Sequence, residues 1–290
     1  MNQPPNYAKE EPGSIVAVLM DLLPVESKLF RDLRLCIEAF ILSMLSMYAI
    51  RLIGVPGAGL VSIVLSSATM TPRLNQILSI NRERIWSEEG NGRRVNFDSI
   101  ISGLSIFFGM FIAFILIGII SSKADLVKDF DFILTQTRVD PGAVLSPERF
   151  AHGFQIFQHN LSVLITLAAL SFIYRSLGTM FALGWNAGVW GVTIVLFMGG
   201  GGETGLSPFI YGVTILIAIL PHLLTEAASY LVGALAAIFL SRGISLYSIG
   251  DTRLNRVLAA VSVLALLSIA LLASGAVLEH HVPRLVLELI

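Results

Sequence analysis

The 290-residue chain is too apolar for a soluble domain, since 55% of its residues are hydrophobic and only 13% are charged, against about 25% charged in soluble domains. Its 19 basic and 20 acidic side chains nearly cancel, so the net charge says nothing about a charged partner. The basic residues form no nucleic-acid-binding stripe, and we expect no nucleic-acid partner. The single cysteine, Cys36, excludes an intrachain disulfide and a thiolate metal cluster.

Apolar segments of the length that crosses a bilayer, roughly 20 residues, recur along the chain. They are continuous rather than alternating, which argues against a transmembrane barrel. The pattern predicts an all-α fold, a polytopic transmembrane helical bundle of about seven spans. The expected spans are residues 36–53, 58–74, 98–121, 150–174, 178–198, 221–241 and 256–277.

Four regions follow from this pattern. Residues 1–35 are expected to form a cytoplasmic tail and an amphipathic segment at the membrane surface, because charged and apolar positions are mixed there. Residues 36–121 would hold an N-terminal hairpin, a charged loop at 75–97 and the third span. A polar loop at 122–149 would then lead into the C-terminal membrane domain, residues 150–290.

The apolar stretch at residues 209–241 is longer than a span requires. As one straight helix it would measure about 50 Å, against about 30 Å for the hydrocarbon core. Pro221 lies inside it, lacks an N–H group and clashes with the preceding turn. We therefore expect a broken element, with a half-helix at 209–219 and a full span at 221–241.

Lysine and arginine residues predict the orientation of the chain. With the N-terminus in the cytoplasm, 13 of the 19 basic residues fall on the inner side and six on the outer side. Because inner loops carry the excess of basic residues, a cytoplasmic N-terminus and an outer C-terminus are expected.

The main candidate for a polar or ion site is His222 with Glu226. The two residues lie four apart and share a helix face, and ionisable residues inside a span are usually functional. The pair could carry a proton, bind a cation or contribute two metal ligands. Alternatively, Glu226 hydrogen-bonds His222, and the pair satisfies backbone groups that Pro221 leaves open.

Asn160 and Asn186 are the other candidates for that site, as polar residues within apolar runs. Each could form a hydrogen bond between helices, for about 1 kcal/mol, or line a polar pathway. Glu279, which precedes His280 and His281, is expected to cap the last span at the membrane interface.

Small residues recur at four-residue spacing on two expected spans. Such spacing lets helices approach closely, within one chain or between two copies. The expected helix-packing residues are Gly184, Gly188, Ser229, Gly233 and Ala237.

Catalytic and cofactor motifs do not stand out in the sequence. It has no Walker A motif, no GxSxG and no HExxH, and no aspartate-rich cluster. We therefore expect a protein that is not an enzyme and has no metal and no cofactor. An intramembrane enzyme would need a nucleophile or a metal beside His222.

Two stretches carry a family resemblance, FQIFQHNLSVLITLAALSFIYRSLGTMFALGWNAGVWG at 154–191 and LPHLLTEAASYLVGALAAIFLSRGI at 220–244. They contain His159-Asn160, an Asn-Ala-Gly segment after Trp185, and a Pro-His-x3-Glu motif. Together they resemble the stage II sporulation protein M family. The ending LLASGAVLEHHVP is similar to that of its longer, archaeal-type members.

The resemblance implies a multi-pass protein of a prokaryotic plasma membrane. The family's namesake works in a peptidoglycan-remodelling complex and is regarded as a membrane scaffold for hydrolases, and we do not transfer its sporulation role. We favour a non-enzymatic scaffold or assembly component whose partners are membrane lipids and other membrane or cell-envelope proteins, with a homo-oligomer plausible. The alternative is a transporter or channel that uses the His/Glu site at a broken helix.

Overall fold

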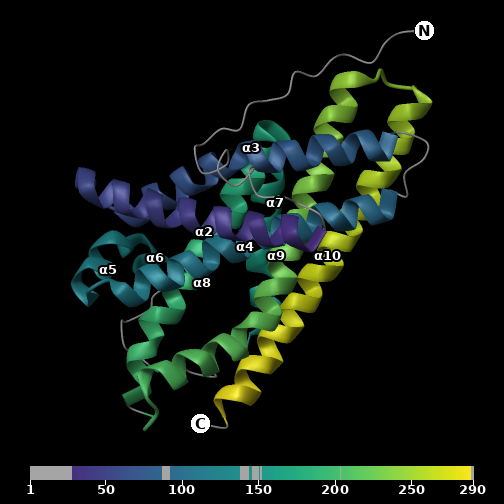
Figure 1. Cartoon of the computed structure of the whole chain (residues 1–290). Coiled ribbons are helices and arrows are strands. Elements are labelled where there is room, and N and C mark those ends of the chain that lie inside the picture. Colours follow the sequence, from purple (N-terminus) through teal and green to yellow (C-terminus); the bar gives the residue numbers. More distant parts are fainter. Residues whose placement is uncertain are drawn as a thin grey trace.

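A computed structural model of the protein describes residues 28–86, 92–137, 144–145, 150, 152–202 and 204–288. Within these ranges the chain is helical and contains no strand, which confirms the predicted all-α fold (Figure 1). The long helices are α2 (Lys28–Ile53), α3 (Ala58–Trp86), α4 (Gly92–Ile120), α7 (Gly153–Tyr174), α8 (Ser176–Met198), α9 (Pro208–Leu246) and α10 (Thr252–Leu287).

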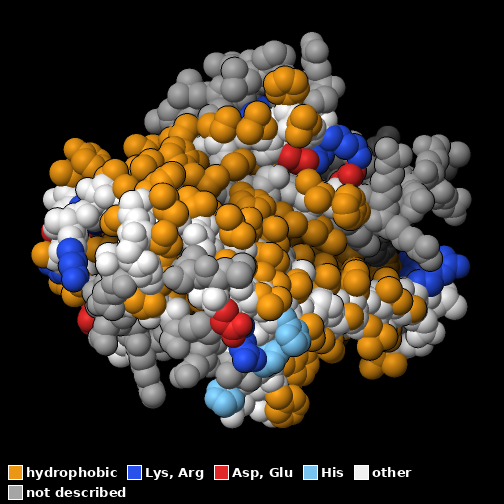
Figure 2. All heavy atoms as spheres, turned by 90° about the horizontal axis from the view of Figure 1, so that it is seen from below, with side chains coloured by type: hydrophobic (Ala, Val, Ile, Leu, Met, Phe, Trp, Pro, Cys, Tyr) orange, Lys and Arg blue, Asp and Glu red, His pale blue; other side chains and the backbone are white. Residues whose placement is uncertain are grey.

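In the described part of the chain, six of these helices are long and apolar enough to cross a membrane, which agrees approximately with the seven expected spans. The long helix outside that set is α3, because its second half, from Arg73 to Trp86, is rich in polar and charged residues. Hydrophobic side chains form a broad band across the middle of the face seen in Figure 2. Such a surface suits contact with lipid.

One detail of the prediction is corrected at α9, which runs without interruption over 39 residues. Ser207 starts the helix by accepting a hydrogen bond from the backbone N–H of Ile210, 3.3 Å away, and Pro208 follows at the first turn. The helix remains continuous through Pro221 and changes direction in its first half (Figure 1). Proline bends a helix by removing one backbone bond, so the expected half-helix is joined to the span.

Helices also extend into regions that were expected to be loops. Residues 28–35 belong to α2 rather than to a surface segment, and residues 1–27 lie outside the described part. The expected charged loop at 75–97 is largely the facing ends of α3 and α4, with only 87–91 outside the described residues.

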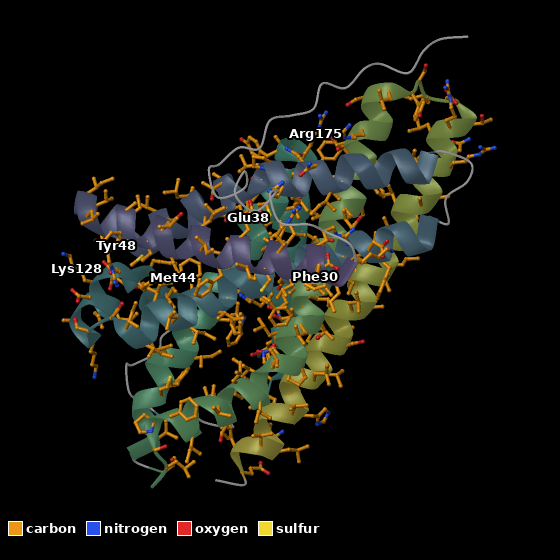
Figure 3. All side chains as sticks on the ribbon, in the orientation of Figure 1. Phe30, Glu38, Met44, Tyr48, Lys128 and Arg175 are labelled. Atoms are coloured by element: carbon orange, nitrogen blue, oxygen red, sulfur yellow. The ribbon has the colours of Figure 1, made fainter. Side chains whose placement is uncertain are left out.

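The expected polar loop at 122–149 contains α5 (Lys123–Asp129) and α6 (Asp131–Thr137). Between them Phe130 is buried and meets Phe114 of α4 edge to face. Arg51 of α2 holds the same region, since its Nε donates to Asp129 Oδ2 at 2.7 Å. The two short helices therefore pack against one end of the bundle, where Figure 3 places Lys128 and Tyr48.

A buried ion pair joins α2 to α3. Arg73 Nε donates to both carboxylate oxygens of Glu38, at 3.0 and 3.1 Å, and the two side chains are 5% and 1% exposed. Figure 3 shows Glu38 where the two helices run side by side. Gly109 of α4 packs on the same stretch of α2, against the carbonyl oxygen of Cys36.

The last two helices form an antiparallel hairpin. At 39 and 36 residues, they measure about 58 and 54 Å and exceed the thickness of a bilayer. Their connecting turn projects beyond the rest of the bundle (Figure 1). Asp251 caps α10 by accepting from the N–H of Arg253, and hydrogen bonds from Arg253 lower the pKa of this carboxyl.

Candidate functional site

Two buried carboxyl groups meet between the helices of the hairpin. Glu226 lies at the middle of α9 and is 3% exposed, and Glu279 of α10 is 9% exposed. The two carboxyl groups lie close enough to interact with each other. A hydrogen bond between them would require a proton on one of the two, because an ionised carboxylate can only accept. Asn160 of α7 adds a third contact by donating its Nδ2 hydrogen to Glu226 Oε1.

Small residues on α10 set the register that brings the carboxyl groups together. A Cβ added at Gly275, one turn before Glu279, would lie 3.3 Å from the Glu226 side chain. Further along, the Ser229 and Ser268 hydroxyls each donate to the other residue's backbone carbonyl, at 2.8 and 2.9 Å. This close contact leaves little room for the helices to slide past each other.

The carboxyl pair lies on the wall of a cavity of about 440 Å³. Three exposed polar residues at the start of α7 line it as well, namely His152 just before the helix, and Gln155 and His159 within it. The cavity therefore extends from a polar rim at the start of α7 to Glu226 of α9 and Glu279 of α10. Its other lining residues are Leu145, Phe150, Ile156, Asn160, Val163, Trp185, Asn186, Val189, Trp190, Thr193, Ile194, Phe197, Ile215, Ile219 and Tyr230.

The α8 wall of the cavity carries a buried hydroxyl that is not used by the protein. Thr193 is 5% exposed, and its Oγ1 has no hydrogen-bond partner within the described part of the structure. A buried polar group without a partner costs free energy, of order 1–3 kcal/mol. Its position on the cavity wall makes a bound molecule a natural partner.

His222 does not join the carboxyl pair, although it shares a helix with Glu226. It is fully buried, and neither ring nitrogen has a hydrogen-bond partner among the described residues. Its ring packs edge to face on Trp190, with 5.5 Å between centroids. The expected hydrogen bond between Glu226 and His222 is therefore wrong, because the carboxyl turns to Asn160 and Glu279 instead.

Asn186 lines the cavity from α8, and its Nδ2 donates to the carbonyl of Ala182 at 2.9 Å. Three of the four candidate residues, Asn160, Asn186 and Glu226, thus border one cavity. His222 lies behind Trp190, which itself lines the cavity.

Glu279 was expected to cap the last span at the membrane interface and was not among the predicted site residues. Because α10 continues to Leu287, the residue is buried inside the bundle. A helical pattern of small and apolar residues leads to it, namely Ser268, Leu272 and Gly275, all of which are buried. The spacing of these residues along the helix predicts that Glu279 lies on the same packed face.

The expected helix-packing residues lie in contacts within this chain. Gly184 and Gly188 of α8 face Ser67 and Ile63 of α3, respectively. On α9, Gly233 meets Leu164 of α7 and the Ser268 hydroxyl of α10. The remaining two are Ser229, bonded to Ser268, and Ala237, which is buried.

Two neighbouring carboxyl groups make up the ionisable chemistry of this site. In the described ranges, no group of three or more His, Cys, Asp or Glu residues is placed to hold a metal ion. A pair of hydrogen-bonded carboxyls can hold a proton, release it, and bind a cation in its place.

A comparison with protein families matches residues 105–282 to the model of Stage II sporulation protein M. The chain belongs to the stage II sporulation protein M family. The match begins within α4 and includes Asn160, Asn186, Glu226 and Glu279, so the whole carboxyl site lies inside it. Comparisons with curated proteins and with solved structures found no match.

Proposed function

We propose that this integral membrane protein of the stage II sporulation protein M family moves a small solute across the membrane, coupled to a proton held by Glu226 and Glu279. The supporting observation is the carboxyl pair on the wall of a cavity within the helical bundle. Their carboxyl groups are not needed to join the two helices, since α9 and α10 are also held together by the reciprocal hydrogen bonds of Ser229 and Ser268.

The energetics of buried acids favour this role over a purely structural one. Ionisable groups inside a membrane are costly, and they usually mark ion paths or proton relays. Glu226 stands at the middle of α9, away from both ends of the helix, and transporters commonly bind their substrates near the middle of the membrane. The bend in the first half of the same helix supplies a point at which one side of the cavity can move.

We propose a plasma-membrane location with a cytoplasmic N-terminus. The excess of basic residues on that side supports this orientation. The rim formed by His152, Gln155 and His159 would then face the outer side. Reporter enzymes fused after Leu246 and after Leu287 should report inner and outer positions, respectively, and the reverse result would overturn the orientation.

The test of transport uses proteoliposomes that contain a pH-sensitive dye, because a solute exchanged for one proton can cross without moving net charge. Solutes of several classes, including amines, amino acids, carboxylates and sugars, are applied with and without a pH gradient. At least one class should change the internal pH, and Glu226→Gln or Glu279→Gln should abolish this change. Glu288→Gln is the matched control, since this acid is exposed at the end of α10. An internal pH that responds to no class, or equal responses in all variants, would refute the proposal.

A scaffold role, in which the protein assembles with other membrane or cell-envelope proteins or with a second copy, is the second candidate. It is supported by the rigid contacts of Gly109, Gly184 and Gly188, where an added methyl group would collide with a neighbouring helix. Native mass spectrometry of the protein extracted with its lipids would test it. A stable complex that survives both glutamine substitutions, together with an internal pH that responds to no solute, would favour the scaffold. Neither role involves catalysis.

A further inference from the structure

We propose that the cavity binds an organic ammonium ion with an apolar body, and that this ion displaces the proton shared by Glu226 and Glu279. The inference rests on the proposed transport function and names its class of solute. Three independent features of the cavity support it: the sign of its charge, its aromatic walls, and the unused hydroxyl of Thr193.

The cavity is acidic. Among its described lining residues, Glu226 and Glu279 are the acids, and none is Lys or Arg. The other titratable groups that face the pair are His152 and His159 from α7 and Tyr230 from α9, and the α8 wall contributes none. His222 lies nearby on α9, screened by Trp190. A cationic ligand is therefore the one whose charge this site complements.

Aromatic side chains line the cavity that contains the two acids. Trp185 and Trp190 of α8 and Tyr230 of α9 border the cavity, along with Phe150 and Phe197. Ring faces attract ammonium groups, and ring edges pack against apolar bodies. The volume of about 440 Å³ lies in the range of pockets for small organic ligands, roughly 300–1,000 Å³. A bare metal ion would leave most of this space unfilled.

Thr193 sets the length of the ligand. The contact between Trp190 and His222 fixes the level at which α8 and α9 face each other. Thr193 lies three residues along α8 from Trp190, and Glu226 lies four residues along α9 from His222. Because the helices run in opposite directions, the two sites are separated by roughly 10 Å along the helix axes. The ligand would thus carry its ammonium group at one end and a hydroxyl or carbonyl group at the other.

The exchange is balanced in charge and protons. In the proposed empty site, one of the two carboxyl groups is protonated and donates its O–H hydrogen to the other. When the ammonium ion enters, that O–H bond breaks, the proton leaves to solution, and both carboxylates accept N–H hydrogen bonds from the ligand. One cation replaces another, so no oxidant or reductant is required.

The intrinsic fluorescence of two cavity tryptophans provides the assay. The chain has three tryptophans, and Trp185 and Trp190 line the cavity, so the Trp86→Phe variant reports mainly on the cavity. This variant is placed in lipid nanodiscs and titrated with phenylbutylammonium, and with two controls of the same shape, neutral phenylbutanol and anionic phenylbutanoate.

The ammonium compound should change the fluorescence at concentrations at least tenfold below those of either control. Its apparent Kd should rise by up to about tenfold for each pH unit lowered, since one proton competes with it. Glu226→Gln and Glu279→Gln, each folded by size-exclusion profile, should remove the preference for the ammonium compound, and Glu288→Gln should keep it. Thr193→Val should weaken binding of a hydroxyphenyl analogue but not of the parent compound.

Equal binding of all three compounds, or binding that is independent of pH, would overturn the ammonium assignment. If the internal pH of the proteoliposomes responds only to a solute of another class, the assignment fails while proton-coupled transport stands. If phenylbutylammonium binds as expected but no solute changes the internal pH, the ligand class stands and the transport role fails.

Discussion

Replacing Glu38 with glutamine should destabilise the N-terminal part of the bundle strongly. Its carboxylate accepts two hydrogen bonds from Arg73 Nε at 3.0 and 3.1 Å, and both side chains are almost fully buried. Glutamine keeps the shape but removes the charge, so the guanidinium stays buried without its counter-ion. Breaking a buried ion pair in this way costs about 3–5 kcal/mol.

Two controls separate charge from packing. The double variant Glu38→Leu with Arg73→Leu removes both charges, and such replacements are often close to neutral. Asp98→Asn disrupts the ion pair with Lys28, whose side chain is about half exposed, and pairs of that kind contribute about 0–1 kcal/mol. The expected order of stability is therefore wild type and double variant together, then Asp98→Asn, and Glu38→Gln lowest.

The protein carries its own reporter for this measurement. Cys36 is its single thiol, lies two residues from Glu38 and is partly buried. A dye that fluoresces on reaction with thiols would therefore follow the opening of α2 in a thermal ramp. The midpoint for Glu38→Gln should fall by roughly 10 °C. An unchanged midpoint, or a double variant as unstable as the single one, would refute the assignment of the stability to the charge pair.

Three further changes can be measured by the same thermal assay. Gly109→Ala should lower the free energy of unfolding by about 1–3 kcal/mol, because its Cβ would overlap a backbone oxygen of α2. The control Gly202→Ala should be neutral, because no atom lies within 4 Å of the added group. Equal stabilities of the two variants would contradict the close contact. Ser229→Ala and Ser268→Ala should each cost about 0.6 kcal/mol, up to about 1.7, and no loss in either variant would show that the reciprocal bonds are not formed. Arg175→Gly should stabilise the folded protein by about 1 kcal/mol, because the backbone φ of this residue is 54°, a value that glycine adopts with less strain. A loss of stability would argue against strain at this turn, where Figure 3 labels Arg175.

The membrane-spanning architecture could be predicted because span length and apolar continuity are local properties of the sequence. The boundaries could not, since α3, α4 and α10 continue through charged residues at their ends. The break expected at Pro221 followed from local preference alone. In the structure α9 packs along α7, α8 and α10, and this surrounding contact keeps the bent helix continuous.

The candidate site was predicted in part for a similar reason. Four-residue spacing correctly places His222 and Glu226 on one helix, but the rotation of the neighbouring helices decides which side chains each one meets. Glu226 therefore faces Asn160 and Glu279, and His222 faces Trp190. Glu279 was missed because the average span length of about 20 residues ends α10 before it.

The most direct test of the central claim is a count of the protons released when the transported solute binds. Protein in nanodiscs is mixed, in weakly buffered solution with a pH-sensitive dye, with the ammonium compound that gives the largest response in the proteoliposome assay. Wild type and Glu288→Gln should release about one proton for each solute bound, and Glu226→Gln and Glu279→Gln should release none. Binding without proton release in the wild type, or the same release in the glutamine variants, would contradict the claim that this carboxyl pair couples the solute to a proton.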